Sequence, residues 1–154
     1  MPPTIVPSVA ALKSFVGQKL GVSEWVTVTQ AQINSFAEAT GDHQWIHVDV
    51  ERAKRESPFK QPIAHGYLTI SLAPVLLPQV VRVEGARMAV NYGLESMRLP
   101  APVPSGARLR MAAELKDVRD MPGGGARVTF GMVFEVEGGT KPACIADAIY
   151  VYYP

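Results

Sequence analysis

The second half of the chain alternates apolar and polar residues with a period of two. Between residues 127 and 137 one set of alternate positions is apolar, while the positions between them are mostly charged or hydroxylated. This alternation predicts a β-strand with one face against a core and the other in solvent. Residues 107–118 alternate in the same way and are predicted to form a second such strand. The apolar positions are Leu109, Met111, Ala113 and Leu115 in one segment and Val128, Phe130, Met132, Phe134 and Val136 in the other.

Further strands extend this predicted sheet. Residues 121–125, Met-Pro-Gly-Gly-Gly, separate the two alternating segments and suit the loop of an antiparallel hairpin. Residues 143–153 are apolar on both faces except at Asp147, which predicts a strand in the middle of the sheet, and residues 138–140 supply the turn before it. Residues 87–93 are predicted to form another strand.

The first half has helical periodicity. Thr29 and Gln32 form a capping-box pattern, and the apolar face that follows ends at Gly41, a residue type that commonly closes helices. A loop is expected over residues 42–48. Asp49 then caps a predicted short helix that extends through Arg55.

Residues 66–77 are apolar on nearly every side, which predicts a buried helix. Pro74 removes the hydrogen bond to Ile70, so a kink or an early end is expected. This helix is the one candidate large enough to be covered by the apolar face of the sheet. The predicted fold is α+β, a curved antiparallel sheet wrapped around a long central helix, in one domain over residues 1–154.

Composition narrows the classes of partner. Lys and Arg total 15 and Asp and Glu 14, so the net charge of +1 does not favour nucleic acid. The single cysteine, Cys144, can form neither an internal disulfide nor a zinc cluster, which favours a reducing compartment. The longest apolar run, residues 66–81, is interrupted by polar residues and is shorter than the roughly 20 apolar residues that a membrane span needs. The N-terminus lacks the pattern of a secretory signal. We therefore expect a cytoplasmic protein with no membrane partner.

The residues able to do chemistry are concentrated between positions 42 and 65: Asp42, His43, His47, Asp49 and His65, including all 3 histidines. An aspartate five residues before a histidine in a loop lets both side chains converge on one point. A carboxylate and an imidazole that meet at one water can polarise it, one taking a proton while the other holds or donates one.

The surrounding residues resemble a known family. The runs FAEATGDHQWIHVD at 36–49 and PIAHGYLTISL at 62–72 resemble the hydratase motif of MaoC-like proteins, and the likeness continues through VNYG at 90–93 and RLPAPVPSG at 98–106. This family includes (R)-specific enoyl-CoA hydratases and related dehydratases of the hotdog fold. The resemblance implies reversible addition of water to a trans-2-enoyl-CoA, giving (R)-3-hydroxyacyl-CoA.

The resemblance also implies residue roles and partners. Asp42 and His47 would be the catalytic pair, and the backbone N–H of Gly66 would face the thioester oxygen. Ser71 and His65 would support the site, and Tyr67, Asn91 and Arg98 are candidates for substrate contact. Neither a metal nor a redox cofactor is expected, and coenzyme A is part of the substrate. A homodimer is expected because relatives pair and because a free edge strand exposes unpaired backbone groups.

Other interpretations remain open from the sequence. A hotdog acyl-CoA thioesterase would direct the water at the carbonyl carbon, and a noncatalytic acyl-thioester binder or structural partner subunit of a dehydratase would not turn over alone.

Single residues also have structural interpretations. Gly66 can instead permit close packing, Ser71 can form a hydrogen bond to the preceding helical turn, and Asp49 is explained as a helix cap. A metal on His43 and His47 is disfavoured because their four-residue spacing lies in a predicted loop.

Overall fold

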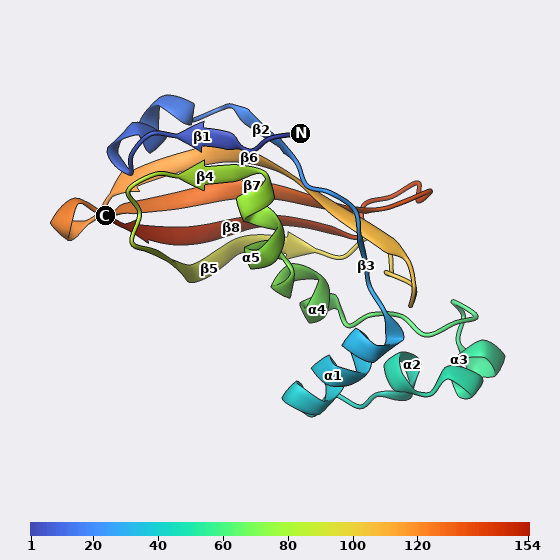
Figure 1. Cartoon of the computed structure of the whole chain (residues 1–154). Helices are drawn as coiled ribbons and strands as arrows, with labels where there is room; N and C mark the ends of the chain where they lie inside the picture. The colour runs from blue at the N-terminus through green and yellow to red at the C-terminus, as the bar shows by residue number, and fades with distance from the viewer.

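A curved antiparallel sheet dominates the computed structural model, which describes residues 1–154 (Figure 1). Its strands are β2 (Lys19–Val22), β3 (Val26–Thr27), β5 (Met88–Arg98), β6 (Arg108–Asp120), β7 (Ala126–Val136) and β8 (Cys144–Tyr153). The order across the sheet is β2-β6-β7-β8-β5, and β3 continues the β2 edge by pairing with β6. Strand β8 therefore lies in the interior of the sheet between β7 and β5, as predicted, whereas β5 is an open edge.

The alternating pattern correctly predicted which face of the sheet is buried. Leu109, Met111 and Leu115 on β6 are fully buried, as are Phe130 and Phe134 on β7, and all belong to one hydrophobic core. The β6–β7 hairpin turns through a short 3₁₀ segment, η3 (Pro122–Gly124), where the glycine-rich loop was expected. Register shifts near Tyr92 and Glu95 place extra residues in β5, which increase local curvature.

The central helix is broken, and part of it is exposed. It consists of α4 (Gly66–Ser71), α5 (Ala73–Leu76) and the 3₁₀ turn η2 (Leu77–Gln79). The break at Leu72 lies two residues before Pro74, in agreement with the predicted interruption. Leu68 and Leu76 are buried, with α4 contacting β8 and α5 contacting β6.

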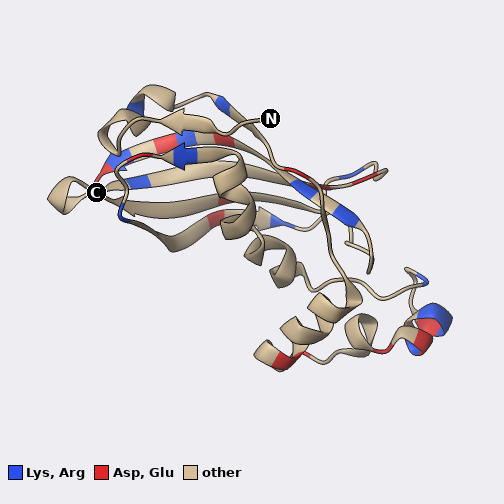
Figure 2. Cartoon of the chain, viewed as in Figure 1, with Lys and Arg blue, Asp and Glu red and all other residues tan.

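The expectation that this helix is buried on all sides was wrong. Tyr67 is 70% and Val75 61% exposed, because within one chain the sheet covers only the side that carries Leu68 and Leu76. The segment from Gln61 to Val81 also contains no Asp, Glu, Lys or Arg, which leaves α4 and α5 uncoloured by charge in Figure 2.

Three helices extend beyond one end of the sheet (Figure 1). They are α1 (Gln30–Thr40), α2 (Trp45–Val48) and α3 (Val50–Glu56). The Thr29 hydroxyl accepts the Gln32 N–H, and Gly41 closes α1 with a φ of 82°, in the left-handed region that favours glycine. The Asp49 carboxylate caps α3 by accepting from the Arg52 N–H.

Helix α2 is a correction, since residues 42–48 were expected to be a loop. One turn of helix is too short to show a periodic pattern in the sequence. The turn is held by main-chain hydrogen bonds from His47 N–H to Gln44 O (3.0 Å) and from Asp49 N–H to Trp45 O (3.0 Å).

The N-terminal elements were not predicted. They are β1 (Thr4–Val6), the 3₁₀ helix η1 (Ala10–Phe15), β2 and β3. Strand β4 (Val81–Val83), which follows the central helix and pairs with β1 in parallel, was not predicted either. None of the helices is long and apolar enough to span a lipid bilayer.

Candidate active site

Asp42, His47 and His65 meet between the helical extension and the start of α4. Each residue contributes one polar side-chain atom, a ring nitrogen or a carboxylate oxygen, and these three atoms lie within 4.8 Å of one another. His47 and His65 are 6% and 2% exposed, whereas Asp42 lies in the exposed turn that joins α1 to α2. The cluster therefore presents a solvent-accessible carboxyl group beside two buried imidazoles.

Main-chain contacts fix the state of the His47 ring. Its Nδ1 lies 2.7 Å from the Ile63 carbonyl oxygen, which can only accept a hydrogen bond, so Nδ1 carries the proton. In the neutral ring Nε2 then keeps its lone pair. Burial lowers the pKa of His47 below 6.5 and the nearby His65 ring lowers it further, against the opposing effects of the Ile63 hydrogen bond and of Asp42. Neutral His47 is thus a proton acceptor at pH 7.

Gly66 follows His65 directly and opens α4, where the helix offers its N–H no acceptor. An added Cβ at Gly66 would overlap Cδ1 of Leu99, so a larger residue here would require the Leu99 side chain to move. The Leu99 side chain and Gly66 both line a small pocket of about 190 Å³ with mainly apolar walls. Both interpretations of Gly66 remain consistent with this position: an amide donor and a packing glycine.

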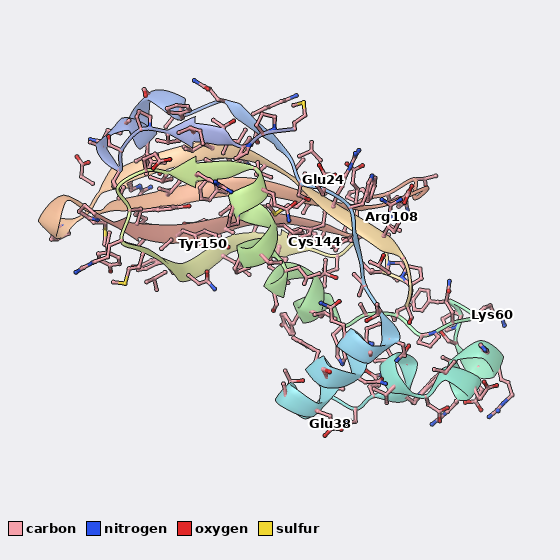
Figure 3. The ribbon with its side chains drawn as sticks, in the orientation of Figure 1. Glu24, Glu38, Lys60, Arg108, Cys144 and Tyr150 are labelled. Carbon is pink, nitrogen blue, oxygen red and sulfur yellow. The ribbon has the colours of Figure 1, made fainter.

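A second and larger hollow lies between the central helix and the open edge of the sheet. This β5 groove has a volume of about 410 Å³, within the range usual for small-molecule sites. Figure 3 labels Tyr150, which lies on β8 in the floor of the groove. The lining residues are Ile70, Ser71, Ala73, Pro74, Asn91, Tyr92, Gly93, Leu94, Ala148, Ile149 and Tyr150.

The other predicted site residues lie apart from the cluster. Ser71 donates to the Tyr67 carbonyl at 2.6 Å and faces the β5 groove rather than Asp42 or His47. Asn91 lines the same groove. Tyr67 is largely exposed, and Arg98 is exposed with Nη1 donating to the Met97 carbonyl at 2.9 Å.

His43 is separate from the cluster, although it lies next to Asp42 in the sequence. Its Nε2 is 3.5 Å from the Glu38 carboxylate, and half of its side chain is exposed. The metal pair considered from the sequence, His43 and His47, is therefore not brought together. His65, expected from the resemblance to support the site, lies in the cluster with Asp42 and His47.

The geometry of this three-residue cluster does not favour a metal ion. The His47 and His65 rings stack with centroids 3.9 Å apart and planes inclined by 25°. An imidazole binds a metal through a lone pair in its ring plane, and two stacked rings direct these lone pairs along separate, nearly parallel planes. One ring nitrogen on each histidine is also already hydrogen-bonded to a carbonyl.

Sequence reasoning could not have found two further contributors to the cluster. The Ile63 carbonyl acts through its main chain, for which the residue type gives no signal. Phe36, noted only as part of the apolar face of α1, packs its ring 4.8 Å from that of His65.

Comparisons with known proteins agree with this fold. A family model described as "MaoC like domain" matches residues 12–131. The 3-hydroxyacyl-thioester dehydratase Z of Mycobacterium tuberculosis is 50% identical over 145 residues, which are 94% of this chain and 95% of the relative. Nodulation protein N of Rhizobium meliloti is 40% identical over 145 residues, covering 94% and 90% of the two chains.

Solved structures show the same architecture. The (R)-hydratase from A. caviae involved in PHA biosynthesis superimposes with a TM-score of 0.65 at 25% identity, covering 90% of this chain and 98% of that one. The monoamine oxidase regulatory protein from Archaeoglobus fulgius gives a TM-score of 0.78 at 24% identity, covering 100% and 99%, and supports the fold. The chain belongs to the MaoC-like family of hotdog-fold dehydratases and hydratases.

Proposed function

We propose that this protein is an (R)-specific enoyl-CoA hydratase, which adds water reversibly to a trans-2-enoyl-CoA to give (R)-3-hydroxyacyl-CoA. The observation that carries the proposal is the convergence of Asp42 with a neutral, buried His47, whose Nδ1 is bonded to Ile63 and whose Nε2 can accept. The dehydratase name of the 50% identical relative supports the same reaction in its reverse direction.

The two groups are suited to hold one water molecule. A carboxylate accepts hydrogen bonds only, and neutral His47 with its proton on Nδ1 accepts at Nε2. A water molecule that donates one O–H to each keeps an oxygen lone pair free to attack C3 of the enoyl group. One of the two residues takes a proton from the water and the other remains its hydrogen-bond partner.

Addition is complete when a proton reaches C2. As the water oxygen bonds to C3, the C2–C3 π electrons move toward the thioester carbonyl and form an enolate. The proton released by the water returns from the accepting residue to C2 on the same face, so that H and OH are added and neither residue is consumed. The Gly66 N–H is the proposed donor to the enolate oxygen, a contact whose loss typically costs about 2.7–4 kcal/mol of barrier in comparable sites.

The acyl chain is assigned to the β5 groove. Helix α4 begins at Gly66 and ends at Ser71, which lines the groove, so a thioester held at Gly66 can extend its chain along this helix. Asn91 and Ser71 supply polar groups on otherwise mainly apolar walls. Tyr67 and Arg98, both exposed, are proposed to contact the coenzyme A portion, and no further cofactor is required.

A second copy of the chain is the proposed partner at β5. All residues of this edge strand are exposed except Met97, and Val90 and Leu94 are each more than two-fifths exposed. An unpaired strand of this length exposes a row of backbone hydrogen-bonding groups that a partner strand satisfies. Tyr67 and Val75 of the central helix are further exposed apolar side chains.

Light scattering during size-exclusion chromatography tests this dimer. Val90→Glu introduces a charge on the β5 edge and is expected to shift the protein toward monomer. Val133→Glu is the matched control, because Val133 is 39% exposed on β7, which is already paired on both sides. A wild-type monomer, or equal effects of the two variants, would contradict pairing at β5.

The activity is tested by following an enoyl-CoA in two ways, through loss of conjugated absorbance and through release of free thiol. Wild-type protein is expected to remove the absorbance without releasing thiol. Asp42→Asn and His47→Gln are expected to lose roughly 10²–10⁴-fold in kcat. His43→Gln is the control, since this histidine lies outside the cluster.

Other outcomes separate the alternative functions. Release of thiol would identify a thioesterase, and turnover that requires an added second chain would identify a partner subunit. The buried Cys144 is not a suitable nucleophile for a covalent thioesterase mechanism, because burial raises the pKa of its thiol to about 11.

A further inference from the structure

His65 makes more contacts with the cluster than a packing residue requires. Its Nε2 lies 3.0 Å from the main-chain oxygen of Asp42, and one face of its ring stacks on His47. The Phe36 ring of α1 packs against it at 4.8 Å, inclined by 54°. His65 therefore joins the turn that carries Asp42, the helix that carries His47, and α1.

The hydrogen bonding determines which nitrogen of this ring carries the hydrogen. The Asp42 carbonyl oxygen can only accept, so Nε2 of His65 carries the hydrogen. Nδ1 is buried and has no hydrogen-bond partner. A hydrogen placed on Nδ1 instead would be a buried N–H without an acceptor, which is unfavourable. The geometry thus selects the tautomer with the hydrogen on Nε2.

Apart from the His65 bond, the turn that carries Asp42 is held by hydrogen bonds to neighbouring residues of the same segment. Among these, the Asp42 N–H donates to Thr40 Oγ1 at 3.3 Å, and the Gln44 N–H donates to Asp42 Oδ1 at 3.3 Å. The bond from His65 is the contact that joins Asp42 to the start of α4. Without it, the carboxylate can move relative to His47, although the two must share one water in the proposed reaction.

We propose that His65 is a positioning residue that holds Asp42 and His47 in a common geometry, through an Nε2–H bond to the Asp42 main chain and a ring face against His47. This inference rests on the proposed hydratase function and specifies how its catalytic pair is kept together. His65 touches neither the water nor the substrate in this role. The ionisable groups that face it are Asp42, from the α1–α2 turn, and His47, from α2.

Two substitutions separate the two contacts. In His65→Gln the amide N–H can still reach the Asp42 carbonyl, but the ring face is lost. In His65→Phe a ring remains against His47, but the donor is lost. His43→Gln again serves as the control because that ring is half-exposed and outside the cluster.

Steady-state kinetics provide the first readout. Misplacement of a catalytic group by about 1 Å can reduce rates by on the order of 10²-fold, so we expect His65→Phe to lower kcat by roughly 10–100-fold. KM should change far less, because His65 does not contact the substrate. His65→Gln should recover part of the lost kcat, and all rates are corrected for the folded fraction measured by circular dichroism. Equal kcat in wild type and both variants, or losses explained by unfolding alone, would overturn the proposal.

Nitrogen NMR of the wild-type imidazoles provides a readout that needs no catalysis. His65 is expected to carry its hydrogen on Nε2, and His47 is expected to be neutral at pH 7 with its proton on Nδ1. In His65→Gln the His47 titration should move to higher pH, since the burial and the neighbouring imidazole that lower its pKa are partly removed. A hydrogen on Nδ1 of His65 or an unmoved His47 titration would each refute the proposed contacts.

These two readouts also distinguish the two proposals. Inactive wild-type protein with the expected histidine states would reject the hydratase function while retaining the contacts of His65. Active wild-type protein with altered histidine states would reject the role of His65 alone.

Discussion

The contact between Gly66 and Leu99 makes the structure testable by a double-mutant cycle. Gly66 is outside the left-handed region, so its backbone accepts alanine, but the new Cβ would overlap Leu99 Cδ1. The Leu99 side chain must move by about 1 Å or more to restore an ordinary van der Waals distance. Gly66→Ala therefore displaces Leu99 rather than straining α4.

The expected energies follow from the burial of Leu99. Complete burial of a leucine side chain contributes roughly 1.5–3 kcal/mol, and Leu99 is 46% exposed, so its displacement costs about 1 kcal/mol. At a position whose backbone accepts it, alanine is about 0.4–1 kcal/mol more favourable than glycine, because it reduces the conformational entropy of the unfolded chain. The two effects nearly cancel in Gly66→Ala. In a Leu99→Ala background the displacement cost is absent, and the same substitution should stabilise the protein by roughly 0.4–1 kcal/mol.

Urea denaturation of wild type, both single variants and the double variant measures the coupling energy, which should be about 1 kcal/mol. Independent sites add to within about 0.3–0.5 kcal/mol. Additivity within that margin would refute the placement of Leu99 over Gly66. A large destabilisation by Gly66→Ala that persists without the Leu99 side chain would show instead that α4 itself resists the methyl group.

Three further predictions concern stability. Because the pKa of His47 is lowered from 6.5 in the folded protein, the unfolded chain binds the proton first, and the free energy of unfolding should fall as pH drops below about 6.5. Urea titrations between about pH 5 and 8 should show less of this fall in His47→Gln; an unchanged pH dependence would contradict it. Thr29→Ala removes the acceptor of the Gln32 N–H, and should cost about 1 kcal/mol, lowering the Tm by about 2–4 °C. At Gly41, with φ of 82°, alanine should cost about 1–2 kcal/mol, and asparagine less; equal Tm values would contradict a left-handed residue there.

The sheet could be predicted because apolar and polar residues alternate within single strands such as β6 and β7. On β7, Phe130 and Phe134 recur on one face, and this alternation is visible without knowing any partner strand. The short strands β1 and β4 carry no such pattern. Their pairing, Thr4 with Val81, is set by tertiary contacts between distant segments of the chain.

The exposed side of the central helix could not be predicted from hydropathy. Val75 was expected in the core because it is apolar, but hydropathy does not state what covers a residue. An apolar side chain can be buried by its own sheet or left available to a second chain.

The candidate site was predictable in part. Asp42 and His47 are close in sequence and lie within a recognisable motif, so their convergence could be anticipated. His65 could not be assigned its contacts, because its stacking on His47 depends on the path from α3 to α4. The separation of His43 from His47 likewise depends on the turn at Asp42, where the His43 side chain points toward Glu38.

The polar cluster and the β5 groove come from different parts of the chain. Asp42, His47 and His65 precede or open α4, whereas the groove floor is contributed by β5 and β8. Substitutions at floor positions such as Leu94 or Ile149 can thus change the size of the groove while leaving the residues around His47 intact. Within this architecture, ligand preference can diversify through the sheet edge independently of the reacting groups, which offers a practical route for engineering.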